Sequence, residues 1–120
     1  MATIMVVDDE TALLHLVGEF LSQDLGHQVT VHESGESAIQ AFGNDSNVNP
    51  DLLITDYRMQ GMTGAQLIQE IHNQGRCIKN ILLTGYLEKN VQQSLEPYST
   101  ICLKKPVSLK ALEDLIIEIL

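Results

Sequence analysis

The 120-residue sequence contains no apolar run approaching the roughly 20 residues that a membrane-spanning helix needs. Its first ten residues, MATIMVVDDE, place carboxylates where a signal peptide would need its apolar region to continue. These two absences predict a soluble, cytoplasmic protein that makes no contact with a membrane.

Basic residues are also scarce. Seven Lys and Arg stand against sixteen Asp and Glu, which gives a net charge of −9, and the only adjacent basic pair is Lys104-Lys105. Nucleic-acid backbones are bound by clustered Lys and Arg, so this composition argues against direct contact with nucleic acid. An acidic excess suits solubility, or a site that gathers cations.

Cysteine and histidine show no pattern typical of a metal or disulfide site. Cys77 and Cys102 are too far apart to form a C-x-x-C motif, so we expect reduced thiols in or near the core, as in a cytosolic protein. Metal-ligand spacing is likewise missing from the four histidines, which we expect on the surface or on helix faces: His15, His27, His32 and His72.

The chain has no internal repeat, no low-complexity segment and no stretch long enough to be a domain linker. Its length suits a single domain spanning residues 1–120, and 44% of its residues are hydrophobic, which is enough for a core. The most polar stretch, residues 43–50, is predicted to be a surface loop.

Short apolar runs alternate five times with amphipathic segments. Strands are predicted at residues 3–8, 28–32, 51–55, 78–84 and 100–104, the second of them at an edge because it is more polar. Helices are predicted at residues 11–24, 36–42, 64–75, 88–95 and 108–120. Because each right-handed crossover covers one face of a sheet, the alternation predicts an α/β fold with a five-stranded parallel sheet and five helices on both faces.

Ligand sites in open parallel sheets lie beyond the carboxyl ends of the strands. Four predicted strands end in chemically capable side chains: Asp8 and Asp9, Asp56, Thr84, and Lys105. Each has an ordinary explanation when taken alone. The acid pair could be helix N-terminal carboxylates, Asp56 a loop residue and Lys105 a solvated lysine.

Together these residues predict a phosphoryl site. If the first and third strands are neighbours, three carboxylates converge, and their mutual repulsion requires a cation. Ligand sets made only of oxygen suit Mg²⁺. Lys105 supplies a second positive charge and Thr84 a hydroxyl donor, and a carboxylate among such groups can act as a nucleophile that forms an aspartyl phosphate.

Four motifs in this order and spacing carry a resemblance to a known family: 4-IMVVDDE-10, 51-DLLITDYRM-59, 81-ILLTGY-86 and 102-CLKKP-106. The sequence resembles the response-regulator receiver domains of two-component signalling over essentially its whole length. This resemblance implies the flavodoxin-like strand order 2-1-3-4-5.

The resemblance assigns a role to each phosphoryl-site residue. It implies that Asp56 is the phosphoacceptor and that Thr84 is the hydroxyl that bonds a phosphoryl oxygen. It also implies that Lys105, rather than Lys104, is the phosphate-binding lysine, because Lys105 directly precedes Pro106 in a peptide bond that is usually cis in this family.

The resemblance also implies a Mg²⁺ site, in which Mn²⁺ can substitute. Its protein ligands would be Asp9, Asp56 and the backbone carbonyl of Arg58, with Asp8 acting largely through metal-bound water. The phosphoryl donor would be a histidine kinase or a phosphotransfer protein, and a downstream effector would read the switched conformation. The resemblance is compatible with a phosphorylation-dependent dimer. It implies a signalling domain that catalyses only its own phosphorylation and slow dephosphorylation.

Two positions depart from the family. Receivers typically carry Tyr or Phe where this chain has Cys102, which is too small to rotate inward behind the threonine. We therefore hypothesise that switching relies on Thr84 and the loop from Gly85, with Tyr86 or Tyr98 filling space.

The second departure is Gln60, which stands where proline is frequent and which restores a backbone donor to the loop after Asp56. It predicts a more mobile loop with intact chemistry. Arg58 and Tyr86 occupy the variable positions that flank the phosphoryl group, where they are expected to set the access of water to the acyl phosphate.

Three other functions are alternatives to that of a receiver. Phosphatases of the haloacid-dehalogenase group place Asp-x-Asp after the first strand, whereas Asp8 and Asp9 are adjacent. A flavin-binding relative would need a phosphate loop rich in Ser, Thr and Gly where this chain has 8-DDET-11. The remaining alternative is a degenerate receiver that acts as a phosphorylation-independent binding module.

Overall fold

The computed structural model describes residues 1–44, 49–86 and 88–120 and contains a five-stranded parallel sheet. The strands are β1 (Thr3–Val7), β2 (Gln28–His32), β3 (Leu52–Asp56), β4 (Lys79–Thr84) and β5 (Ile101–Lys104). Their order is β2-β1-β3-β4-β5, and all neighbouring pairs are parallel. The predicted α/β fold and strand order are therefore confirmed.

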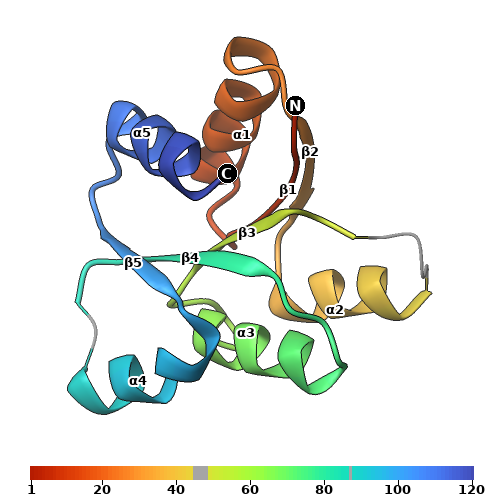
Figure 1. Ribbon diagram of the computed structural model, residues 1–120, viewed down its shortest axis with the longest axis vertical. Coiled ribbons are helices and arrows are strands. Elements are labelled where there is room, and N and C mark those ends of the chain that lie inside the picture. Colours follow the sequence, from red (N-terminus) through yellow and green to blue (C-terminus); the bar gives the residue numbers. More distant parts are fainter. Residues whose placement is uncertain (45–48, 87) are drawn as a thin grey trace.

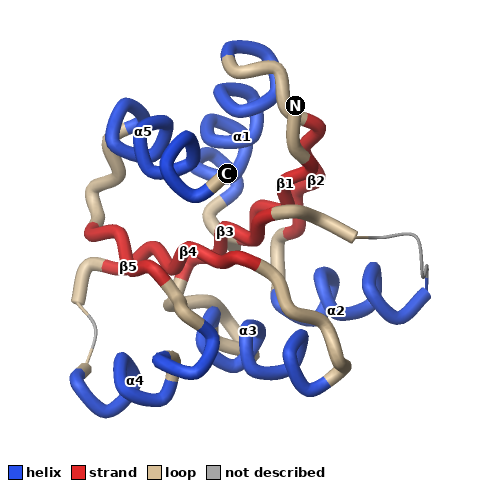
Figure 2. Tube along the Cα trace, viewed as in Figure 1, coloured by secondary structure: helices blue, strands red, loops and turns tan. Residues whose placement is uncertain are grey.

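Figure 1 shows helices on both faces of this sheet, with α1 and α5 on one side and α2, α3 and α4 on the other. Coloured by secondary structure, the strands form a single layer between two helical layers (Figure 2). The helices are α1 (Thr11–Glu19), α2 (Gly35–Asn44), α3 (Gly64–Asn73), α4 (Lys89–Ser94) and α5 (Leu109–Ile119). In the described part of the chain, no helix is both long and apolar enough to cross a membrane.

The two faces of the sheet carry separate cores. Alternate residues of a strand point to opposite faces, so Ile4 and Val6 of β1 pack with α1 and α5, whereas Met5 and Val7 pack with α2 and α3. All five residues of β3 are buried. Burial on both faces explains the nearly continuous apolar composition of the central strands, and it places the end of β3 on a rigid support.

The edge strands are more polar or more exposed than the central ones. β2 has exposed or half-buried residues throughout, and its predicted place at an edge is confirmed. The helix expected over residues 11–24 is α-helical only to Glu19. It continues as a π-helical turn over Phe20–Asp24, in which the Leu25 N–H donates to the Phe20 carbonyl. The loop predicted at residues 43–50 lies partly outside the described residues.

The expectation that both cysteines lie in or near the core is wrong, since both thiols are exposed. Cys77 lies in the connection between α3 and β4, and Cys102 lies on β5, an edge strand that presents three of its four residues to solvent. Residual burial raises the pKa of the Cys102 thiol, which disfavours the reactive thiolate.

Candidate functional site

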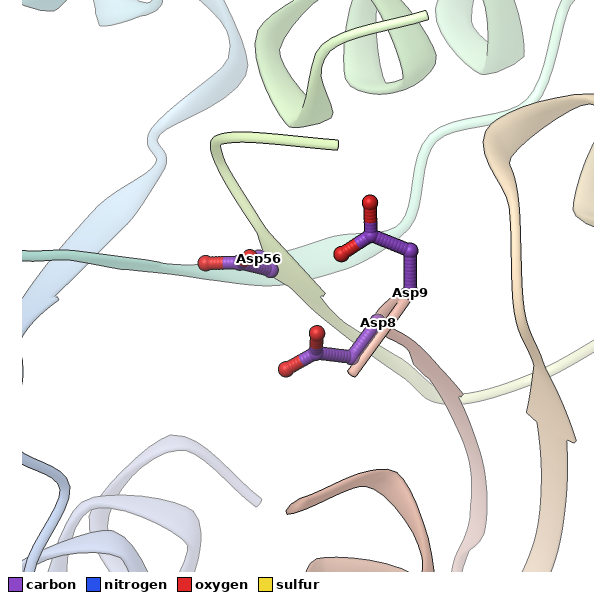
Figure 3. A group of neighbouring side chains, drawn as sticks. All are labelled: Asp8, Asp9 and Asp56. Carbon is purple, nitrogen blue, oxygen red and sulfur yellow. The ribbon is translucent and has the colours of Figure 1, made fainter. Parts of the chain in front are cut away.

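Strand pairing places the predicted carboxylates at one edge of the sheet. β1 and β3 are in register, with Val7 opposite Thr55. Asp8 and Asp9 follow β1 directly, and Asp56 is the last residue of β3 (Figure 3). One carboxylate oxygen from each of the three residues lies within 4.8 Å of the other two. The convergence expected from the sequence is therefore present.

The three carboxylates differ in their surroundings. Only 2% of the Asp8 surface and 6% of the Asp56 surface are exposed, whereas Asp9 is exposed to solvent. Burial raises the pKa of the Asp8 carboxyl, and the negative charges of Asp56 and Asp9 act in the same direction. The Glu10 N–H, which donates to Asp8 Oδ1 at 2.9 Å, and Lys105 oppose this shift without cancelling it. The folded protein therefore disfavours the ionised form of Asp8 relative to water.

Lys105 reaches into this group as predicted. Its Nζ lies 2.8 Å from Asp56 Oδ1, and the Lys105-Pro106 peptide bond is cis. The Lys105 N–H donates to the Thr84 carbonyl, which fixes the start of this segment against the end of β4. Burial alone would lower the pKa of the Lys105 ammonium, but the hydrogen bond and the negative charge of Asp56, aided by Asp8 and Glu10, raise it.

The donor set fits a hard divalent cation. Three carboxylates face one ammonium, so the cluster keeps surplus negative charge, and its converging ligand atoms are all oxygens. Such a set matches Mg²⁺, which is held by one or two carboxylates together with water or phosphate. Asp8, Asp9 and Asp56 would hold the ion. The Arg58 carbonyl, in the loop directly after Asp56, remains a predicted ligand.

Thr84 is buried at the end of β4, with 7% of its surface exposed. Its hydroxyl donates to the Tyr86 carbonyl at 2.8 Å. The group predicted to bond a phosphoryl oxygen is therefore held by its own loop in this structure. Tyr98 packs against the His72 ring, with 4.5 Å between ring centroids, whereas 71% of the Tyr86 surface is exposed.

Hydrogen bonds tie the loop after Asp56 to other elements. The Gln60 N–H donates to Asp9 Oδ2 at 3.0 Å, and the Met62 N–H donates to Glu36 Oε1 at 3.1 Å. Thr63 then caps α3 through a reciprocal pair of bonds with Gln66. These bonds connect the loop to the β1–α1 connection, α2 and α3, and the greater mobility expected from the missing proline stays a prediction. Sequence reasoning missed Glu36 altogether.

An open depression of about 460 Å³ lies beside the carboxylates. Asp9 and Gln60 line one part of it, and Arg58 and Tyr86 are among its other walls. The two variable positions singled out from the sequence thus border the same solvent-accessible space as an acid of the cluster.

Replacing Asp8 with asparagine should raise the free energy of unfolding at pH 7 by about 1 kcal/mol in metal-free buffer. Asparagine removes a buried negative charge but keeps the Oδ1 that accepts the Glu10 N–H. The pKa of the Asp8 carboxyl is raised in the folded state. The carboxyl therefore contributes to the stability of the wild type below its unfolded-state pKa, and this contribution is lost as the pH rises through its folded-state pKa. The gain should therefore shrink as pH falls toward about 4.

Urea denaturation at pH 7 and pH 4 in EDTA would measure this difference. Asp24→Asn, an exposed acid at the far end of the π-helical turn, is the matched control and should change little at either pH. A loss of stability in Asp8→Asn at pH 7 would contradict the electrostatic account.

Comparison with known proteins supports the same family. The family model for the response regulator receiver domain matches residues 4–117. The response regulator protein TrrA from Thermotoga maritima, solved in complex with Mg²⁺-BeF, superposes with a TM-score of 0.83 at 31% identity, covering 100% of both chains. A CheY-like receiver domain protein from Methanospirillum hungatei gives 0.87 over 98% of this chain and 92% of that one; at 24% identity it supports the fold alone.

Curated relatives are longer than this chain. Transcriptional regulatory protein GlrR of Escherichia coli is 34% identical over 85 residues, which are 71% of this chain and 18% of that protein. Sensor histidine kinase RcsC of Salmonella typhi is 30% identical over 112 residues, 92% of this chain and 11% of that protein. With the sheet order, the acidic cluster and the family match in agreement, this chain belongs to the receiver domain family of two-component response regulators.

Proposed function

We propose that residues 1–120 form one phosphoacceptor receiver domain, in which Asp56 takes a phosphoryl group from a phosphohistidine. The observation that carries this proposal is the placement of Asp56. It is 6% exposed, paired with Lys105 at 2.8 Å, and within 4.8 Å of the carboxylates of Asp8 and Asp9. A carboxylate that only closed a turn would have no need for these three neighbours.

In the proposed step, an oxygen of Asp56 forms a bond to phosphorus as the bond between phosphorus and the donor imidazole nitrogen breaks. The bonding electrons leave with the imidazole. Lys105, already beside Asp56 Oδ1, offsets negative charge on the transferring oxygens. Bound Mg²⁺ would supply further positive charge to those oxygens. TrrA, solved with Mg²⁺-BeF, supports this choice of ion.

The signal would leave the site through Thr84. Its hydroxyl must give up the Tyr86 carbonyl before it can donate to a phosphoryl oxygen. This exchange would move the loop that carries Tyr86, the exposed one of the two candidate aromatics; Tyr98 is already packed on His72. Charge added at Asp56 would thereby shift the population toward a second conformation of the loop after β4.

The relatives suggest the partners. A sensor histidine kinase and transcriptional regulators share this domain, so we propose a histidine kinase or phosphotransfer protein as donor and an effector as the reader of the switched state.

Incubation with acetyl phosphate and Mg²⁺, followed by intact-mass spectrometry, tests the function. We expect a mass gain of one phosphoryl group that EDTA prevents and that peptide mapping locates to the segment containing Asp56. If neither a small donor nor a phosphorylated histidine kinase produced this gain, the chain would be a phosphorylation-independent binding module.

A further inference from the structure

The loop between Asp56 and α3 is held by two carboxylates that come from other elements. The Gln60 N–H donates to Asp9, from the β1–α1 connection, and the Met62 N–H donates to Glu36, from the first turn of α2. Two amides on either side of Gly61 are thus bound by two acids. Two hydrogen bonds therefore connect the loop to other elements of the fold.

The residue between these two amides is a glycine in a left-handed conformation. Gly61 has a φ of +76°, and a Cβ there would lie 2.7 Å from Glu36 Oε1. The left-handed backbone favours glycine, and an added Cβ would displace the flexible Glu36 carboxylate from its place beside the Met62 N–H. Glycine at this position therefore leaves room for the Glu36 carboxylate that accepts the Met62 N–H.

One of these two hydrogen bonds is accepted by Asp9, a proposed metal ligand. Asp9 is exposed, so little packing fixes its side chain. The hydrogen bond from Gln60 occupies Asp9 Oδ2 and leaves the other oxygen, and further lone pairs, for a cation. Arg58, whose carbonyl is another proposed ligand, lies only two residues before Gln60. One backbone bond therefore ties together two parts of the proposed cation site.

We propose that the backbone amide of Gln60, braced by Glu36 through the adjacent turn, is a positioning group that presets Asp9 for a divalent cation. This inference rests on the proposed Mg²⁺-dependent function and deepens it. It assigns no role to the Gln60 side chain, which is exposed. The group that matters is an N–H, and proline is the one residue that removes it.

Calorimetric titration of Mg²⁺ and Mn²⁺ into the wild type, Gln60→Pro and Gln60→Ala tests this assignment. Loss of a partner that orients a metal ligand weakens metal affinity by about 10–100-fold, and we expect about tenfold for Gln60→Pro. Gln60→Ala keeps the N–H and should retain the wild-type affinity. A role of the side chain would instead weaken binding in both variants.

A metal-free readout separates positioning from general damage. In the wild type the Gln60 amide proton should be protected from hydrogen exchange, and Asp9→Ala should remove that protection while other loop amides change less. Thermal unfolding in EDTA reports whether Gln60→Pro is folded. If it is not, Glu36→Ala carries the test, because it removes the brace and leaves residues 57–63 unchanged; weaker Mg²⁺ binding is expected.

Failure of the proposed function can be distinguished from failure of the positioning role alone. A wild-type protein that neither binds Mg²⁺ nor gains a phosphoryl group would overturn the proposed function. A wild type that binds Mg²⁺, with a folded Gln60→Pro that binds it equally well, would overturn the positioning role alone. Unchanged affinity in Glu36→Ala would overturn it in the same way where the proline variant does not fold.

Discussion

Replacing Lys105 with alanine should slow the phosphorylation of Asp56 by about 10²–10³-fold, as removal of one preorganised charge-stabilising donor does elsewhere. The ammonium of Lys105 lies 2.8 Å from Asp56 Oδ1. Its raised pKa keeps it charged at neutral pH. The ammonium therefore lies where negative charge is redistributed during phosphoryl transfer. In Lys105→Ala, only solvent and the bound cation would stabilise that charge.

The neighbouring Lys104 provides a matched control. Lys104 is exposed on β5, and Lys104→Ala changes the net charge by the same amount one residue away. Initial rates with acetyl phosphate and Mg²⁺, followed by intact mass, should fall in Lys105→Ala and stay close to wild type in Lys104→Ala. Asp56→Asn serves as the blank that gains no mass. Equal slowing in the two lysine variants would indicate a long-range charge effect and remove the assigned role of Lys105.

The fold and the acidic cluster could be predicted because both follow from strand ends. An apolar run that stops at Asp8 or Asp56 marks the carboxyl end of a buried strand. In a parallel sheet such ends meet at one edge. An error of one or two residues in a strand boundary does not alter this meeting, so Asp9 and Lys105 also lie where the sequence predicts.

The hydrogen bonds within the site could not be predicted from the positions of the strand ends. Glu36 accepts from Met62 across 26 positions, and no spacing rule connects an acid in a helix's first turn to a loop on another strand. The Thr84 hydroxyl faces the Tyr86 carbonyl because of the backbone path of that loop, which composition does not specify.

The expectation for Cys102 failed for a different reason, because it rested on the apolar character of the run 100-TICLK-104. The strand order implied by the family resemblance already placed this strand at an edge of the sheet. With β5 outermost, three of its four residues are exposed. Sequence pattern reports what a strand can bury, whereas its position in the sheet decides what it does bury.

The Gly64→Ala substitution should lower the free energy of unfolding by about 3 kcal/mol, near the upper end for overpacking a well-filled interior. A Cβ at Gly64 would overlap the backbone oxygen of Asp56 and lie 2.8 Å from Leu82 Cδ1. The helix cannot easily shift away, because the Gly64 N–H donates to the Tyr57 carbonyl and Thr63 caps the same turn.

The same clash would act on function, since the atom that must move belongs to the backbone of the proposed phosphoacceptor. Urea denaturation in EDTA measures the stability loss, and the initial phosphorylation rate of the fraction that remains folded measures the displacement of Asp56. Gly85→Ala is the control for stability: nothing lies within 4 Å of its added Cβ, so its unfolding free energy should change by less than about 0.5 kcal/mol. Equal stability of the two variants would mean that α3 can retreat from β3, and that the close approach of Gly64 does not fix the position of Asp56.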